Sequence, residues 1–244
     1  MHHPTDRFNV IVILIDDLGW GELGCYGNAY NESPHMDSLA RSGLRFTDAY
    51  ASSTVCSPSR AGLLTGQAPP RNGITDYLRP ESEWYLPLNP AGTAFADREL
   101  PEDTSFHLDP AMVTMADLFR NSGYHTSIIG KWHLSGYDAQ GVKFGPDKYG
   151  FEEVIMSEQV GIQEGSYFWP YLRIDPAIRP LSGDSEYLID RMNHEAVSCI
   201  KRQAHRPFFL YLSHYAVHTA LAAKRPDVEH FLRPGEREPA DWKN

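Results

Sequence analysis

Residues 9 to 15 read Asn-Val-Ile-Val-Ile-Leu-Ile, a continuous run dominated by β-branched side chains. A run of this kind predicts a strand that is buried on both faces of a sheet. Two similar runs, at 125–130 and 207–213, predict further strands. The first run is followed at once by Asp16 and Asp17, so the chain changes from apolar to acidic within one residue.

Predicted helices alternate with these strands along the chain. They lie at 34–42, from Cys56 onward, at 114–121 before Gly123 and at 185–203, and a fourth strand is predicted at 45–51. Strands that alternate with helices indicate an α/β fold with a largely parallel sheet covered on both faces. The chain of 244 residues is long enough for one such domain with a substantial core.

Each of the three apolar strands leads directly into polar residues. These are Asp16 and Asp17 after the first strand, Lys131 and His133 after the second, and His214 and His218 after the third. The carboxyl ends of parallel strands meet at one edge of a sheet, where functional groups collect. The recurrence therefore predicts one shared site at that edge.

The composition is that of an ordinary soluble globular protein, with 41% hydrophobic and 22% charged residues. The formal net charge of −10 argues against a nucleic-acid-binding protein, which normally presents a basic face. The apolar run at 10–15 is too short to span a membrane, and no secretory signal is visible. As written, the chain is expected to remain in the cytoplasm.

The three cysteines are Cys25, Cys56 and Cys199, which is too few for a disulfide framework. Cys25 and Cys199 are expected to be buried free thiols, and a disulfide between them is the alternative. Cys56 is distinguished by the residues that follow it.

Cys56 begins the segment Cys-Ser-Pro-Ser-Arg-Ala-Gly-Leu-Leu-Thr-Gly, which ends at Gly66. The residues after Cys56 form a helix-start signal that includes Pro58, and proline is favoured at the first helical position. The Cys56 side chain is therefore expected near free amide donors and the positive end of a helix dipole, which suit an anion. Arg60, one turn later, adds a planar positive charge.

This segment resembles the signature of the type I sulfatases, Cys-x-Pro-Ser-Arg-x-x-x-Leu-Thr-Gly. In that family a formylglycine-generating or anaerobic maturation enzyme oxidises the cysteine to formylglycine. The resemblance implies the same conversion of Cys56, with Pro58 and Arg60 at the positions the enzyme reads. It also implies a three-layer α/β/α sandwich of the alkaline phosphatase type. Family members are mostly periplasmic, secreted or lysosomal.

Asp16 and Asp17 stand where the family carries calcium ligands, directly after the first strand. Adjacent carboxylates repel each other unless a cation lies between them, and hard oxygen ligands suit Ca²⁺ or Mg²⁺. Taken alone, an adjacent pair of aspartates favours a solvated acidic loop over a metal site. The resemblance implies that Asp16 and Asp17 bind calcium and that the oxidised Cys56 supplies another oxygen.

A second segment, Gly-Lys-Trp-His-Leu at 130–134, matches another family signature. Lys131 offers a compact ammonium for a sulfate oxygen. His133 offers a base that titrates near neutrality. Without the resemblance, the two would be read as a surface lysine and a packed histidine at the end of a strand.

A third segment, Ser-His-Tyr-Ala-Val-His-Thr at 213–219, resembles the family segment that ends in His-Thr-Pro. The resemblance places His218 beside the leaving group and leaves His214 as either a structural support or a substrate contact. The family proline is replaced here by Ala220, which could loosen the loop without removing the histidine.

The resemblance implies a reaction in which the gem-diol of oxidised Cys56, activated by the cation, attacks sulfur and displaces the alcohol. Lys131, Arg60 and the metal hold the sulfuryl oxygens. His218 protonates the departing oxygen. His133 then removes the proton of the remaining hydroxyl, so that the aldehyde reforms and sulfate leaves.

The resemblance runs from Asn9 to about Lys224 and covers only the N-terminal half of a typical sulfatase. Residues 76–110 show no clear period and are expected to form a loop on the substrate side, and 223–244 are expected to be a truncated tail. The family's further metal ligands and second sulfate-binding lysine have no counterpart here. The sandwich is therefore expected to be incomplete at its C-terminal side, and 1–244 alone weakly active or inactive.

The implied substrate is a sulfate monoester, and the segment at 213–219 favours one carried by a glycan. One alternative is a phosphodiesterase or phosphonate monoester hydrolase of the same superfamily. Another is an enzyme that uses Cys56 as an unmodified thiolate whose pKa is lowered by the helix terminus. The non-enzymatic alternative is a truncated remnant that binds anions or partners.

Overall fold

The structure is a computed structural model that describes residues 7–78, 107–136, 144–157, 167–171, 174 and 177–232. Its elements are β1 (Val10–Ile15), η2 (Trp20–Glu22), η3 (Gly24–Tyr26), α1 (Pro34–Ser42), α2 (Cys56–Thr65), α3 (Pro69–Asn72), α5 (Met115–Asn121), β2 (His125–Gly130), η5 (Pro146–Tyr149), β3 (Glu153–Ile155), α6 (Leu188–Gln203), β4 (Phe208–His214) and α7 (Arg225–Phe231). The four predicted helices and the three apolar strands are confirmed, with ends shifted by a few residues at most.

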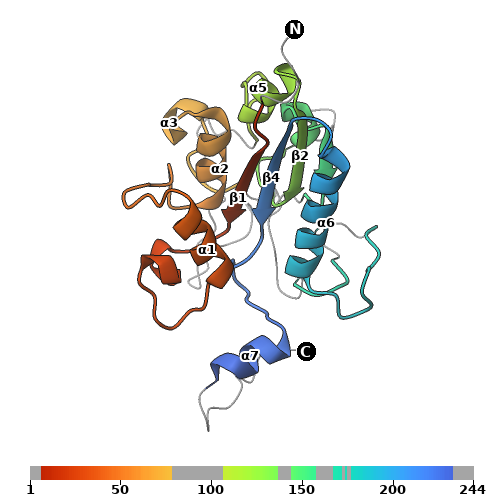
Figure 1. The fold of residues 1–244 in the computed structure, drawn as a ribbon. Coiled ribbons are helices and arrows are strands. Elements are labelled where there is room, and N and C mark those ends of the chain that lie inside the picture. Colours follow the sequence, from red (N-terminus) through yellow and green to blue (C-terminus); the bar gives the residue numbers. More distant parts are fainter. Residues whose placement is uncertain are drawn as a thin grey trace, which may run out of the picture.

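The strands form one parallel sheet in the order β1-β4-β2-β3, and Figure 1 shows β4 between β1 and β2. The pairing aligns Ile15 with His214 and Gly130 with Ser213, so β1, β4 and β2 end level with one another. The polar segments that follow these strands therefore begin at the same edge of the sheet. The predicted parallel sheet is confirmed.

Helices cover both faces of the sheet and make the three layers visible in Figure 1. The central strand β4 is buried along its whole length, and its side chains alternate between two cores. Leu210 and Leu212 join the core beside α6, whereas Phe209 and Tyr211 join the core beside α2 and α5.

The helix α6 packs through one apolar stripe. Its buried residues are Leu188, Met192, Ala196, Cys199 and Gln203. Steps of three and four residues keep these side chains on one face of a helix. Cys199 is a buried free thiol, as expected, and Cys25 is a half-buried one, so the alternative disulfide does not form.

The strand β1 is not buried on both faces, which corrects the sequence prediction. Its exposure alternates along the strand, and Ile11 and Ile13 are 43% and 55% exposed. In the described part of the chain β1 is the edge of the sheet, while α6 packs on β2 and β4. The α6 side of β1 therefore stays uncovered, and only its other side joins the core.

The strand predicted at 45–51 is also wrong. These residues are exposed coil and bends between α1 and α2, with Phe46 and Tyr50 67% and 87% exposed. A segment becomes a strand only where a neighbouring strand satisfies its backbone hydrogen bonds. No strand in the described residues pairs with this segment.

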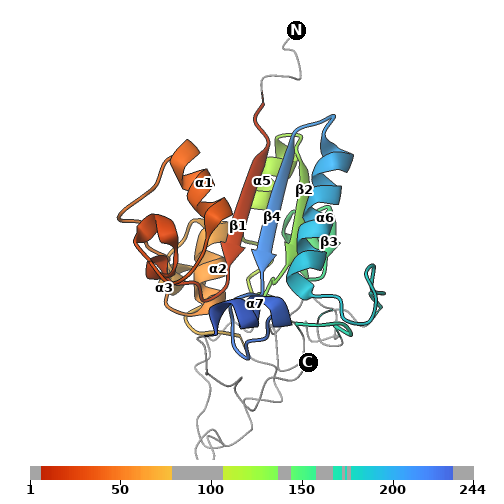
Figure 2. The same ribbon diagram turned by 60° about the horizontal axis from the view of Figure 1, so that its bottom comes forward.

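Part of the predicted tail forms the helix α7, which lies beyond the carboxyl ends of the strands (Figure 2). Its His230 Nε2 lies 2.7 Å from Glu32 Oε1, and the rings of Tyr30 and Phe231 are 5.7 Å apart. Among the helices described, none is long and apolar enough to cross a bilayer.

Two predicted segments fall largely outside the described residues. Of the predicted loop at 76–110, the described part is limited to 76–78 and 107–110. Of the tail at 223–244, residues 233–244 are likewise outside it. The predictions made for these segments remain predictions.

The glycine that ends β2 leads to a stability prediction. Gly130 has a φ of +96°, and a Cβ there would overlap the carbonyl oxygen of Ser213 and the methyl group of Met192. We expect Gly130→Ala to lower the free energy of unfolding by at least about 3 kcal/mol. The cost of a left-handed backbone at a residue other than glycine and the steric overlap of the new Cβ add together. Urea denaturation measures this difference.

Gly27 provides the matched control, because its φ is +101° but a Cβ there would meet no atom within 4 Å. The variant Gly27→Ala is expected to lose only the conformational part, about 1 kcal/mol. Equal losses for the two variants would show that the overlap at Gly130 is relieved by small shifts.

Candidate active site

Asp16, the first residue after β1, lies at the centre of a buried group of charges and is 5% exposed. Its Oδ1 accepts a hydrogen bond from Arg60 Nη2 at 2.9 Å, and its Oδ2 accepts one from Lys131 Nζ at 2.6 Å. Burial raises the pKa of Asp16, but the two adjacent cations together outweigh it and hold that pKa below its usual value. Asp16 is therefore ionised and bound on both oxygens.

Arg60 connects the ends of three strands from a position that is 1% exposed. Besides Asp16, its guanidinium donates to the carbonyl oxygen of Lys131 at 2.8 Å and to Ser213 Oγ at 2.5 Å. These partners follow β1, follow β2 and lie in β4. The guanidinium is thus used to hold strand ends together, and it lies beneath the site rather than at its surface.

Cys56 is the first residue of α2, as the helix-start signal predicts, but Pro58 occupies the third helical position rather than the first. A proline in the first turn still removes only an N–H that has no partner within the helix. The Cys56 side chain is half-buried, and its Sγ lies 3.4 Å from Lys131 Nζ. Sequence and structure therefore agree that Cys56 sits at a helix N-terminus beside a cation.

The pKa of the Cys56 thiol argues against the unmodified-thiolate alternative. Burial raises this pKa by more than the charge of Lys131 lowers it. A thiolate nucleophile would need the opposite direction of shift. The structure favours a protonated Cys56 thiol in the metal-free, unmodified chain.

Asp17 and His218 lie beside this group. Asp17 has a φ of 61°, in the left-handed region that residues other than glycine adopt only where their surroundings impose it. Its Oδ2 lies 3.9 Å from His218 Nε2. Ligand atoms of Asp16, Cys56 and His218 all lie within 4.8 Å of one another. The structure thus groups His218 with two of the three predicted metal ligands.

His133 is buried close to this group and is 3% exposed. Its Nε2 lies 2.8 Å from the carbonyl oxygen of Leu78, so Nε2 carries the proton and Nδ1 carries the lone pair. Nδ1 has no hydrogen-bond partner among the described residues. Burial, and then the charge of Lys131, lower the pKa of His133 to about 3, which keeps the ring neutral.

His214 is not brought into the group. Strand alternation places it on the α6 side of β4, together with Leu212, whereas Ser213 contacts Arg60 on the other side. Burial alone lowers the pKa of His214 to about 4. Its position favours structural support over substrate contact.

Two serines hold the site together, and sequence reasoning assigned them no role. Ser57 Oγ donates to the carbonyl oxygen of His133 at 2.9 Å, and Ser213 Oγ donates to that of Lys131 at 2.7 Å. Both serines lie inside the segments quoted for the resemblance, which is the one signal that could have identified them.

Tyr167 was missed for a different reason. Its buried hydroxyl donates to the carbonyl oxygen of His218 at 2.7 Å and so holds the segment that carries this histidine. A hydroxyl-to-carbonyl bond between distant segments leaves no periodic pattern, and no sequence signal marks Tyr167.

The described residues fit part of a calcium shell. Carboxylates of Asp16 and Asp17 and the oxygen of an oxidised Cys56 are hard donors of the kind calcium prefers. Calcium takes about six to eight oxygens, more than these groups supply. Asp16 and Asp17 would therefore hold calcium only together with further oxygen donors that do not belong to the group around Asp16.

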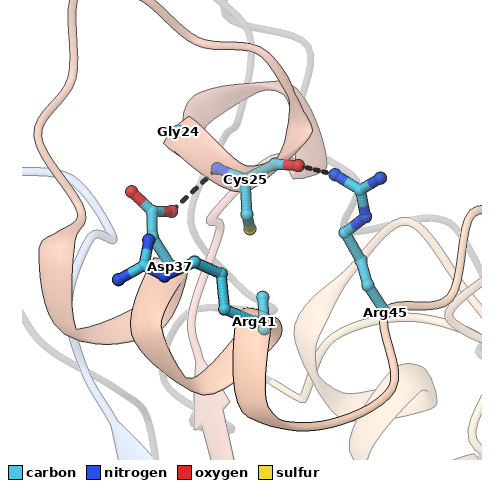
Figure 3. A pocket seen from close by; sticks show the side chains of 6 residues that line it. Gly24, Cys25, Asp37, Arg41 and Arg45 are labelled. Carbon is cyan, nitrogen blue, oxygen red and sulfur yellow. Dashed lines mark hydrogen bonds between the residues drawn. The ribbon is translucent and has the colours of Figure 1, made fainter.

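A separate pocket of about 420 Å³ lies between η3 and α1 (Figure 3). Its lining residues are Gly24, Cys25, Asp37, Ala40, Arg41 and Arg45. Asp37 Oδ1 accepts from the backbone N–H of Cys25 at 2.7 Å, and Arg45 donates to the carbonyl oxygen of Cys25. These bonds hold η3 against α1, and no residue of the group around Asp16 lines the pocket.

The two buried neutral histidines, His133 and His214, predict how stability depends on pH. In the unfolded chain each takes up a proton as the pH falls through about 6.5, whereas the folded protein resists this until about pH 3 and about pH 4 respectively. The unfolded state therefore binds more protons in this window, and stability must fall as the pH falls. We expect the contribution of each histidine to rise toward a limit of about 1.4 kcal/mol per pH unit as the pH falls below about 6.5.

Urea unfolding between about pH 7 and about pH 5 measures this slope. The variant His214→Gln is expected to reduce this slope by the contribution of one histidine, because only His133 then remains buried and neutral. The exposed His205 offers the control, since His205→Gln should leave the slope unchanged. A wild-type stability that is flat or rises on acidification would contradict the prediction.

Comparison with known protein families and curated proteins adds to this geometry. The family model described as Sulfatase matches residues 8–236. The N-acetylgalactosamine-6-sulfatase of Canis lupus familiaris is 36% identical over 239 residues, which cover 89% of this chain and 41% of that protein. Arylsulfatase A of Homo sapiens is 33% identical over 233 residues, which cover 86% of this chain and 41% of that protein. The chain thus spans less than half the length of these relatives.

Solved structures agree with the fold. "Crystal structure of Ps i-CgsB" superposes with a TM-score of 0.69 at 28% identity, covering 91% of this chain and 48% of that one. BT4656 in complex with D-glucosamine-2-N,6-O-disulfate gives a TM-score of 0.62 at 25% identity, covering 97% of this chain and 40% of that one. An alkaline phosphatase superfamily protein from Vibrio parahaemolyticus, at 19% identity and a TM-score of 0.51, shows the same fold. The expected alkaline phosphatase-like α/β fold is confirmed.

Proposed function

This chain belongs to the sulfatase family, and we propose that it carries the nucleophile side of the active site of a sulfuric ester hydrolase. The observation that carries this proposal is the position of Cys56. Its sulfur lies at the N-terminus of α2, 3.4 Å from Lys131 Nζ and within 4.8 Å of ligand atoms of Asp16 and His218. A thiol, an ammonium group and an imidazole ring are thus adjacent in one place.

We further propose that Cys56 is converted to formylglycine by a maturation enzyme and that Asp16 and Asp17 contribute to a calcium site. When present, formylglycine supplies a hydroxyl nucleophile and calcium supplies a Lewis acid.

Lys131 is proposed to bind a sulfate oxygen. Its ammonium is fully buried, and it lies between Asp16 Oδ2 and Cys56 Sγ. A buried cation fixed beside the nucleophile stabilises negative charge without reorganising, and this stabilisation is strongest where water is excluded. Arg60 and Ser213 act as positioning residues, because they hold the strand ends that carry Asp16 and Lys131.

His218 and His133 are proposed to move protons. The His218 ring is 29% exposed and adjoins Cys56, where it can donate a proton to a departing alcohol oxygen. His133 is neutral, and its buried Nδ1 lone pair has no partner in the described residues, so it is available as a base. His214 is left with a structural role.

A sulfated glycan is the proposed substrate class. Support comes from the N-acetylgalactosamine-6-sulfatases among the relatives and from the likeness to a structure that holds a disulfated glucosamine. The phosphonate monoester hydrolase of Agrobacterium radiobacter is 18% identical, with a TM-score of 0.59, which shows a common fold only.

We infer that residues 1–244 form part of a larger catalytic domain. The chain spans 41% of the length of its first relatives, and the described residues supply fewer oxygens than calcium takes. The uncovered face of β1, with Ile11 and Ile13 exposed, adds an apolar surface beside this incomplete site. The chain alone is therefore proposed to be weakly active or inactive.

The test combines mass analysis with kinetics. After co-expression with a formylglycine-generating enzyme, the Cys56 peptide is expected to show the mass change from a thiol to an aldehyde. The matured protein is then combined with a second polypeptide that covers the part of the relatives' sequence absent from residues 1–244. This combination should hydrolyse an aryl sulfate faster than the matched aryl phosphate. A chelator or Cys56→Ala should remove this activity.

Three outcomes would count against parts of the proposal. A Cys56 thiol that stays unaltered after co-expression would contradict the formylglycine assignment. A preference for the phosphate ester would favour the phosphonate or phosphodiester hydrolases of the superfamily. Full calcium-dependent turnover by residues 1–244 alone would contradict the inference of a partial site.

A further inference from the structure

The group around Cys56 combines sulfur, nitrogen and oxygen donors, a mixture that calcium does not prefer. Cys56 offers a sulfur, His218 an imidazole nitrogen and Asp16 a carboxylate oxygen, and these three atoms lie within 4.8 Å of one another. Calcium prefers oxygen ligands, whereas thiolate and imidazole select metals such as zinc. The donor set therefore depends on whether the residue at 56 carries sulfur or oxygen.

We propose that, before Cys56 is oxidised, this chain binds a thiophilic divalent cation, with Zn²⁺ as the best match, through Cys56, His218 and Asp16. The cation takes the place of the proton on the Cys56 thiol, and that proton passes to solvent or buffer. No electron is transferred in this step. Oxidation of Cys56 removes the sulfur ligand, so the same pocket then selects a hard cation.

The geometry is close to that of a tetrahedral site. Zinc bonds of about 2.0 to 2.3 Å place neighbouring ligand atoms about 3.3 to 3.7 Å apart. The observed limit of 4.8 Å exceeds this by about one ångström. His218 and Cys56 are both partly exposed, so their side chains can close this difference by rotation. A water molecule would complete the tetrahedral shell, as it does in zinc sites with three protein ligands.

The charges of the group are compatible with a divalent ion. Asp16, Asp17 and a Cys56 thiolate are anionic, and Arg60 and Lys131 are cationic. Lys131 opposes a metal by repulsion and by binding Asp16 Oδ2, but it also stabilises the thiolate that the metal needs. Arg60 holds Asp16 through its other oxygen, so Oδ2 can exchange Lys131 for the metal while the carboxylate stays in place.

Zinc bound to Cys56 would also affect the maturation of this residue. This effect on maturation is the one part of the inference that rests on the proposed function. A zinc-bound sulfur has released its proton to solvent and shares one lone pair with the metal, so the metal shields it from an oxidising enzyme. Zinc is therefore expected to slow the conversion of Cys56. The binding itself concerns the unmodified chain and does not require that the chain hydrolyse anything.

The experiment uses the unmodified chain, purified from a host without a maturation enzyme, with its Cys56 thiol confirmed by mass. Titration with Co²⁺, a spectroscopic substitute for zinc, is expected to produce a sulfur-to-metal charge-transfer band in the near ultraviolet. Zn²⁺ is expected to abolish this band by competition, whereas Ca²⁺ in excess is expected to leave it intact.

Variants assign the ligands. Cys56→Ser should remove the charge-transfer band, whereas Cys25→Ser and Cys199→Ser should retain it. His218→Ala should weaken cobalt affinity by at least about tenfold, since even outer-shell changes have effects of that size. Circular dichroism confirms that each variant is folded.

Several results would overturn the proposal. These are a band that survives Cys56→Ser, an affinity unchanged in His218→Ala, or displacement of cobalt by calcium as readily as by zinc. Failure here is distinct from failure of the proposed function, because the matured protein is assayed for sulfate ester hydrolysis separately. A chain that binds no cobalt but matures and hydrolyses sulfate esters would refute this inference alone.

Discussion

Replacing Arg60 with alanine is expected to lower the free energy of unfolding by about 3 to 5 kcal/mol, the range for breaking a buried ion pair. The guanidinium is 1% exposed and donates to oxygens that belong to three different strand ends. Its removal leaves Asp16 with Lys131 as its remaining cation, and it leaves Ser213 Oγ without its donor. Urea denaturation of the two proteins measures the loss.

Arg120 is the matched control, since its Nη2 lies 3.0 Å from Asp117 Oδ1 but its side chain is 43% exposed. Arg120→Ala is expected to change stability by less than about 1 kcal/mol, because exposed ion pairs contribute little. Arg60→Lys should recover only a small part of the loss, because an ammonium cannot reproduce the planar fork. Similar losses of unfolding free energy in Arg60→Ala and Arg120→Ala would contradict the conclusion that the buried Arg60 guanidinium holds the strand ends together.

Replacing His218 with alanine is expected to lower the turnover of a sugar sulfate by about 10² to 10⁴-fold in the matured protein, the usual contribution of a general acid. The effect should be much smaller for an aryl sulfate, whose phenolate leaves without needing a proton. This difference between substrates separates proton donation from simple structural damage. Steady-state kinetics on the two esters measures it.

The exposed His205 supplies the control, because His205→Ala removes an imidazole that belongs to none of the quoted segments. It should leave both turnover values unchanged. If His218→Ala reduces turnover of both esters by the same factor, the role of His218 is to position or bind the sulfate group rather than to protonate the leaving oxygen. Loss of folding in the variant would be detected by its unfolding curve.

The sequence by itself predicted the sheet, its parallel direction and the edge at which the site forms. Continuous β-branched runs and helical spacing are local patterns, and the carboxyl ends of parallel strands meet wherever such a sheet forms. The segment around Cys56 likewise predicted a helix that begins at this residue, since its start signal is encoded within a few residues. The pairing of Lys131 with the same site was predicted from where its strand ends.

Only the tertiary structure decided how deeply each side chain is buried and which groups it contacts. The sequence position of Arg60 could not show that its guanidinium is buried and bonded to strand ends rather than free to bind an anion. These bonds depend on Asp16 and Ser213, which lie far away in the chain. The same holds for the failure of 45–51 to form a strand, since a strand exists only where a partner pairs with it. Local patterns determine which elements form, but contacts between distant residues determine burial, charge and protonation, and hence chemistry.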